Sequence, residues 1–76
     1  MEAREIFELI LRADDALKYA TEDKLPARSK QARDLLERAR DEARSVQNEG
    51  LVQQAEQRLA DLDSITRRDE PPPASR

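Results

Sequence analysis

Apolar residues recur every three or four positions in three separate stretches of the chain. In the first stretch the recurring positions are Ile6, Leu9, Ile10, Ala13, Ala16, Leu17 and Ala20. Successive residues of an α-helix are rotated by about 100°, so these positions form one continuous stripe. The pattern predicts an amphipathic helix over residues 2–20.

A second stripe follows Pro26, whose missing N–H is harmless in the first turn of a helix. Leu25 should be extended, because a residue before proline avoids the helical region. Gly50 is the only glycine, and we expect it to end this helix in the left-handed conformation. The stretch predicts a helix over residues 26–48, with its stripe formed by Ala32, Leu35, Leu36, Ala39, Ala43 and Val46.

The third stretch predicts a helix over residues 51–65, antiparallel to the second because the connection is short. From Thr66 the apolar period stops, and Pro71–Pro73 cannot continue a helix. We therefore expect an all-α three-helix bundle over residues 1–65 and a disordered tail over residues 66–76. The stripe of the third helix comprises Leu51, Val52, Ala55, Leu59, Leu62 and Ile65.

The composition leaves few ways to stabilise so short a chain. Among its 76 residues 41% are charged, yet the net charge is only −3, which together with the strong apolar period favours folding over disorder. Small domains often depend on disulfides, metal ions or self-association. The chain has no cysteine and no histidine, so self-association or very regular helix packing remains.

The same composition argues against an enzyme. A serine or threonine nucleophile needs a base to activate it, and the chain has no histidine. Metal sites usually cluster cysteine or histidine, and one glycine cannot form a phosphate-binding loop. We expect no catalytic residues, cofactor, metal ion or small-molecule substrate.

The apolar segments are also too short for a membrane. None approaches the roughly 18 residues of a membrane span. The first residues, MEAREIFELILRADD, carry acidic side chains where a signal peptide needs an uninterrupted apolar run. We expect a cytoplasmic protein that does not enter a membrane.

Phe7 and Leu11 add apolar surface beyond the stripe of the first helix. With Ile6 at 0°, Phe7 lies at about 100° and Leu11 at about 140°. This helix could have a wide buried face because it packs between the other two. Alternatively, Phe7 and Leu11, with Ala3, form a contact surface for another protein or a second copy of the chain.

A basic cluster at the start of the second helix supports a different hypothesis. Arg28, Lys30 and Arg33 could contact nucleic acid in a helical regulator. However, most arginines alternate with acidic residues, whereas nucleic-acid binding favours an uninterrupted basic surface. We therefore expect a protein partner rather than nucleic acid.

The segment ARDLLERARDEA over residues 32–43 resembles the second helix of a tetratricopeptide (TPR) repeat. ADDALKYA and LVQQAEQRLADL are similar to the first and third helices of a microtubule-interacting-and-transport (MIT) domain. The Trp-Leu-Gly-Tyr pattern of a TPR repeat is missing upstream, and no proline closes the repeat at Arg44. The resemblance implies a three-helix protein-binding module and carries over no functional residues. A small adaptor, regulatory subunit or homodimer is the function we expect.

Overall fold

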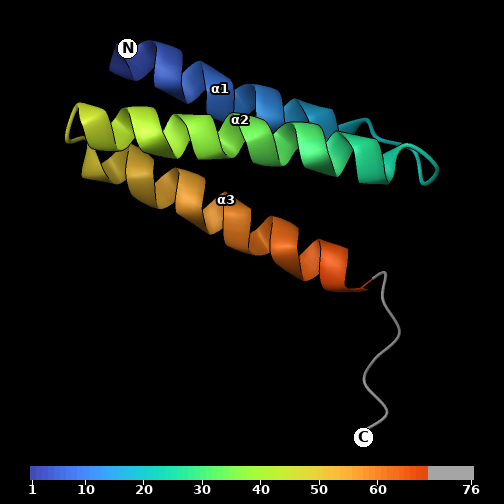
Figure 1. Cartoon of the computed structure of the whole chain (residues 1–76). Coiled ribbons are helices and arrows are strands. Elements are labelled where there is room, and N and C mark those ends of the chain that lie inside the picture. The colour runs from blue at the N-terminus through green and yellow to red at the C-terminus, as the bar shows by residue number, and fades with distance from the viewer. Residues whose placement is uncertain (69–76) are drawn as a thin grey trace, which may run out of the picture.

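Three helices, each antiparallel to the next, make up the computed structural model. It describes the backbone of residues 1–68 and the side chains of residues 1–64. The helices are α1 (Ala3–Lys18), α2 (Leu25–Ser45) and α3 (Glu49–Arg68). α2 lies between the other two (Figure 1). α1 and α3 each pack along α2 and contact each other much less. The predicted all-α three-helix fold is confirmed.

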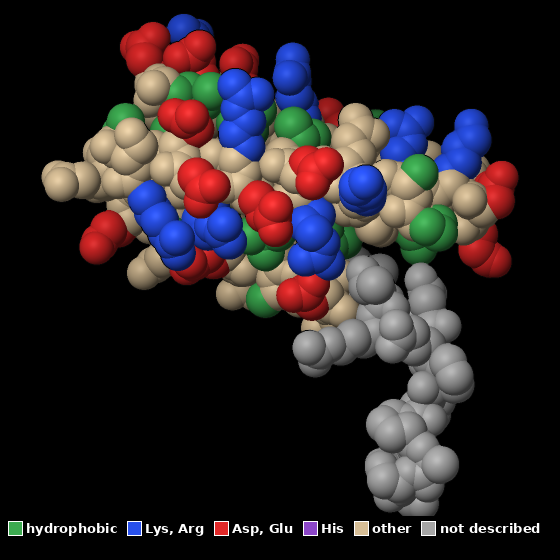
Figure 2. All heavy atoms as spheres, viewed as in Figure 1, with side chains coloured by type: hydrophobic (Ala, Val, Ile, Leu, Met, Phe, Trp, Pro, Cys, Tyr) green, Lys and Arg blue, Asp and Glu red, His purple; other side chains and the backbone are tan. Residues whose placement is uncertain are grey.

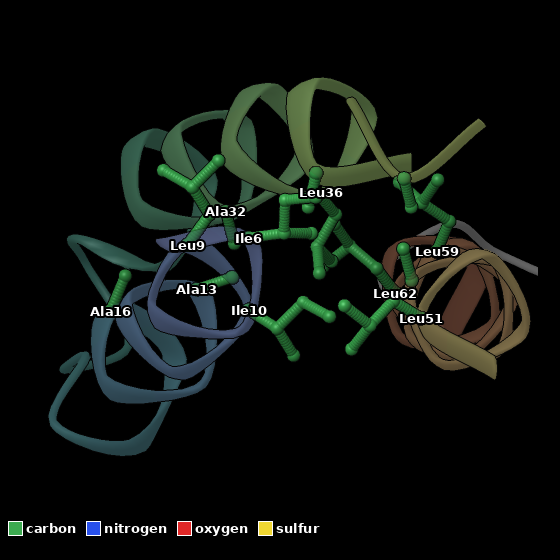
Figure 3. Packing of buried hydrophobic residues seen from close by; sticks show 13 residues of the cluster. Ile6, Leu9, Ile10, Ala13, Ala16, Ala32, Leu36, Leu51, Leu59 and Leu62 are labelled. Carbon is green, nitrogen blue, oxygen red and sulfur yellow. The ribbon is translucent and has the colours of Figure 1, made fainter. Parts of the chain in front are cut away.

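The core follows the predicted stripes. Its largest fully buried side chains are Ile6, Ile10, Leu36 and Leu62, which converge from all three helices (Figure 3). α2 contributes only one large residue to this core, and its other buried positions are alanines. Small side chains let neighbouring helices approach closely, which suits α2 to the central place. The buried alanines of α2 are Ala32, Ala39 and Ala43.

Two stripe residues lie outside the predicted helical core. Val46 was expected in the stripe of the second helix, but it is 44% exposed because α2 ends at Ser45. Ala20 lies beyond α1, which ends at Lys18. The side chain of Ile65 lies outside the described residues.

The prediction for Gly50 was wrong. Gln47 is the residue with a left-handed backbone (φ 58°), and Gly50 belongs to the first turn of α3. Asn48 N–H donates to Ala43 O (2.8 Å) and Gln47 N–H to Arg44 O (3.0 Å), the two bonds of a Schellman motif. The left-handed residue follows the C-cap directly, so it falls three positions before the glycine.

Two further boundaries differ from prediction. Leu25 is helical rather than extended, because Lys24 already has near-helical angles (φ −97°, ψ −6°) and leads directly into α2. α3 continues to Arg68, three residues beyond the predicted end of the third helix and into the predicted tail. The rest of that predicted tail, with Pro71–Pro73, lies outside the described residues.

The described helices differ from membrane spans in their polarity. None of them has a stretch long and apolar enough to cross a bilayer.

Candidate protein-interaction surface

The two sides of α1 differ in how far their apolar residues are buried. Ile6 and Ile10 have no exposed surface, whereas Phe7 is 39% exposed and Leu11 44%. Ala3 is exposed as well. Ala3, Phe7 and Leu11 are spaced by four residues and therefore line one side of the helix. The structure thus brings the three residues of the predicted contact surface together.

The contact surface faces away from α2. Leu9 of α1 is directed toward α2 (Figure 3) and lines a depression together with Arg38 of α2. Phe7 and Leu11 are each two residues from Leu9, which is a rotation of about 200° around the helix. The idea that the first helix is widely buried between the other two is therefore wrong, because α2 occupies that place.

An ion pair borders the contact surface on the side of α3. Arg58 Nε of α3 donates to both carboxylate oxygens of Asp14, at 3.1 and 3.2 Å. Both side chains stay partly exposed, so the pair contributes at most about 1 kcal/mol. The ion pair matters for the position of α3, because it holds α3 against one edge of α1 and leaves the opposite edge open.

Two charged residues stand on that open edge. Arg4 and Asp15 are exposed, and neither forms an ion pair with another residue in the described part of the chain. Arg4, Phe7, Leu11 and Asp15 are separated by three, four and four residues, so they are neighbours along one side of the helix. That spacing is visible in the sequence, but the sequence reasoning followed only its apolar members.

The predicted basic cluster does not form a single patch. Arg33 donates to Asp63 Oδ1 of α3 at 2.6 Å. Arg28 and Lys30 are exposed, but they are two positions apart and point to different sides of α2. Basic and acidic side chains alternate over the face shown in Figure 2. No observation here favours the nucleic-acid alternative.

Shallow depressions elsewhere offer little to a small ligand. One of about 450 Å³ opens between α1 and α2. It brings Arg12 and Arg28 together with Asp15, whose charge opposes theirs. Within the described residues there is no buried polar side chain and no cluster of three or more potential metal ligands. The polar groups of these depressions therefore stay exposed, unlike those that fix a ligand in a specific pocket.

The exposed side of α1 is thus suited to binding the apolar surface of another polypeptide. It presents two large apolar side chains between charged edges, on the helix side that the fold leaves without a neighbour. No protein-family model, curated protein or solved structure matches the chain.

Proposed function

We propose that this protein is an interaction module that docks another polypeptide along the contact surface of α1 and has no catalytic role. The observation that carries the proposal is the 39% and 44% exposure of Phe7 and Leu11 on the side of α1 opposite α2. The proposal leaves catalysis aside because the chain has no histidine or cysteine and no ionisable side chain is buried among the described residues.

The size of the contact surface limits the kind of partner. Full burial of a phenylalanine or leucine side chain stabilises by about 1.5–3 kcal/mol. Phe7 and Leu11 are each about two-fifths exposed, so covering both contributes about 2 kcal/mol. Micromolar binding needs about 8 kcal/mol. A partner must therefore extend beyond these two residues and cover the length of α1, as an amphipathic helix would.

A capture experiment with matched variants tests the proposal. The wild type, a Phe7→Glu/Leu11→Glu variant and a Val46→Glu control are immobilised and exposed to an extract of the native host. Val46 is as exposed as Leu11 but is the C-cap residue of α2 and does not belong to α1. We expect the wild type and control to retain the same partner and the double variant to lose it.

Circular dichroism on the three proteins checks that the helices remain intact. Retention of the same partner by a folded Phe7→Glu/Leu11→Glu variant would contradict the proposal. Equal loss from the Val46→Glu control would also contradict it, because binding would then not depend on the contact surface.

A further inference from the structure

Two charged residues beside the contact surface make its two ends different, because they carry opposite charges. Arg4 precedes Phe7 by three residues, and Asp15 follows Leu11 by four. On the helical wheel Arg4 and Asp15 lie within about 20° of each other. Both are on the side of Leu11 away from Asp14, so the ion pair with Arg58 does not occupy them. Of these two charges, the positive one lies at the N-terminal end of the contact surface and the negative one at its C-terminal end.

Such an edge is complementary to a second copy of itself in antiparallel orientation. A two-fold axis level with Leu9 places Phe7 opposite Leu11 of the second copy, because each is two residues from the axis. Arg4 is five residues from Leu9 and Asp15 is six. The two charges therefore meet at nearly the same height, within about 1.5 Å along the helix.

The symmetry also puts these charges on the same side of the seam. A two-fold axis perpendicular to the helices exchanges the two copies but keeps each residue on its own side. Arg4 and Asp15 share a side, so Arg4 faces Asp15 of the second copy, and the contact occurs twice in the dimer. A parallel pair would place Arg4 against Arg4 and Asp15 against Asp15, which like-charge repulsion disfavours.

We propose that the partner on the contact surface is a second copy of this chain, docked antiparallel along α1 through Phe7–Leu11 contacts and Arg4–Asp15 ion pairs. The inference rests on the proposed function and names its partner. α1 has 16 residues and is about 24 Å long. A seam of this length lies at the low end of interface sizes, where transient complexes occur, so the dimer should form reversibly.

Sedimentation equilibrium over about 1 µM to 1 mM protein, a range that spans weak affinities, measures the association. We expect a monomer–dimer equilibrium for the wild type and the Val46→Glu control. The Phe7→Glu/Leu11→Glu variant should raise the dissociation constant more than about a hundredfold, because it places charge at the centre of the seam. A wild type that stays monomeric across this range would overturn the proposal.

Charge reversal tests the register without touching the apolar residues. Arg4→Glu and Asp15→Arg should each raise the dissociation constant roughly tenfold, because attraction becomes repulsion at two symmetric places. The double variant restores opposite charges and should return to within about threefold of the wild type. Lys30→Glu, a charge reversal at an exposed position of α2, is the matched control. Single variants that bind like the wild type would refute the register.

Spin labels test the orientation. The chain lacks cysteine, so Lys18→Cys provides one label per copy at the exposed end of α1. Lys18 is nine residues from the axis, which places the two labels about 30 Å apart in the antiparallel dimer. A parallel dimer would bring them to about 10 Å, and that result would overturn the proposal.

The two hypotheses can fail separately. If the wild type is monomeric but captures another protein through Phe7 and Leu11, the second-copy inference is wrong and the interaction module stands. If the wild type dimerises equally well after Phe7→Glu/Leu11→Glu, this seam is wrong, and the capture experiment alone decides the proposed function.

Discussion

The α1–α2 and α2–α3 hairpins share the central helix but are held together differently. Six residues join α1 to α2, whereas three residues join α2 to α3. The shorter connection contains the left-handed Gln47 and Asn48, whose Oδ1 accepts a hydrogen bond from Leu51 N–H at 3.2 Å. The longer connection has neither feature, and α2 begins without a side-chain cap at Lys24.

The ion pairs also differ between the two hairpins. Arg33–Asp63 and Arg44–Glu56 join α2 to α3 with N–O distances of 2.6 and 2.8 Å. Between α1 and α2 the described ion pair is that of the N-terminal amine with Glu42, at 3.8 Å. The turn and the charges therefore specify the α2–α3 hairpin, while the docking of α1 on α2 depends mainly on the fit of its apolar side chains.

The largest predicted effect concerns that apolar fit. Ile10→Ala should lower the free energy of unfolding by about 2–5 kcal/mol, because it leaves a cavity at a fully buried position. Leu11→Ala, at the neighbouring exposed position, should lower it by less than about 1 kcal/mol. Urea denaturation of both variants measures the difference, at protein concentrations where the wild type is monomeric. Equal decreases in the free energy of unfolding would mean that Leu11 is buried as deeply as Ile10, which would contradict the comparison.

The next effect concerns the cap of α3. Asn48→Ala should lower the free energy of unfolding by about 1 kcal/mol, because Leu51 N–H loses its acceptor. In the longer connection, Glu22→Ala is the control and should change it by less than about 0.5 kcal/mol. The same denaturation measurement applies. If the control matched Asn48→Ala, the two connections would be equally important and the comparison would fail.

The left-handed residue offers a stabilising substitution. Gln47→Gly should raise the free energy of unfolding by up to about 1 kcal/mol, because glycine adopts positive φ without steric cost. Gln53→Gly, at an exposed position within α3, should lower it by about 1 kcal/mol. Thermal unfolding gives the sign of each change. Destabilisation by Gln47→Gly would show that the turn is not held in the left-handed conformation.

A smaller effect concerns the charges between α2 and α3. Asp63→Asn should lower the free energy of unfolding by about 0.5 kcal/mol, since Arg33 and Asp63 are partly exposed and screened by water. The difference from wild type should shrink in about 1 M salt, where the Debye length falls to about 3 Å. Denaturation at low and high salt measures it. A loss that is independent of salt would argue against an electrostatic origin.

The smallest effect lies in the α1–α2 connection. Thr21 Oγ1 donates to Asp23 Oδ1 at 2.7 Å, and this bond is the main cause that lowers the pKa of Asp23 below its ordinary value. Because the folded-state pKa is lowered, the bond favours folding at neutral pH, and this contribution disappears as the pH falls through that pKa. Thr21→Ala should raise the pKa of Asp23, which NMR titration of the carboxylate measures. An unchanged pKa would contradict the role of the bond.

The periodic part of the fold was predictable because helical geometry is local. The 100° rotation per residue places Ile6, Ile10, Ala39 and Leu62 on core faces whatever the neighbouring helices are. The end of α2 was harder to predict, because the sequence contains a glycine that suits a left-handed turn. The chain instead places Gln47 there and uses Gly50 inside α3.

The candidate contact surface could also be predicted only in part, because its helix angles are local but its exposure depends on tertiary packing. The amino-acid sequence alone determined that Phe7 and Leu11 lie beside the stripe of α1, because their angles on the helix follow from spacing. Only the tertiary structure decided that α2 is the central helix, that Arg58 holds Asp14, and that Phe7 and Leu11 remain partly exposed. A helical wheel gives the direction of each side chain, but which directions are covered depends on how helices distant in sequence pack together.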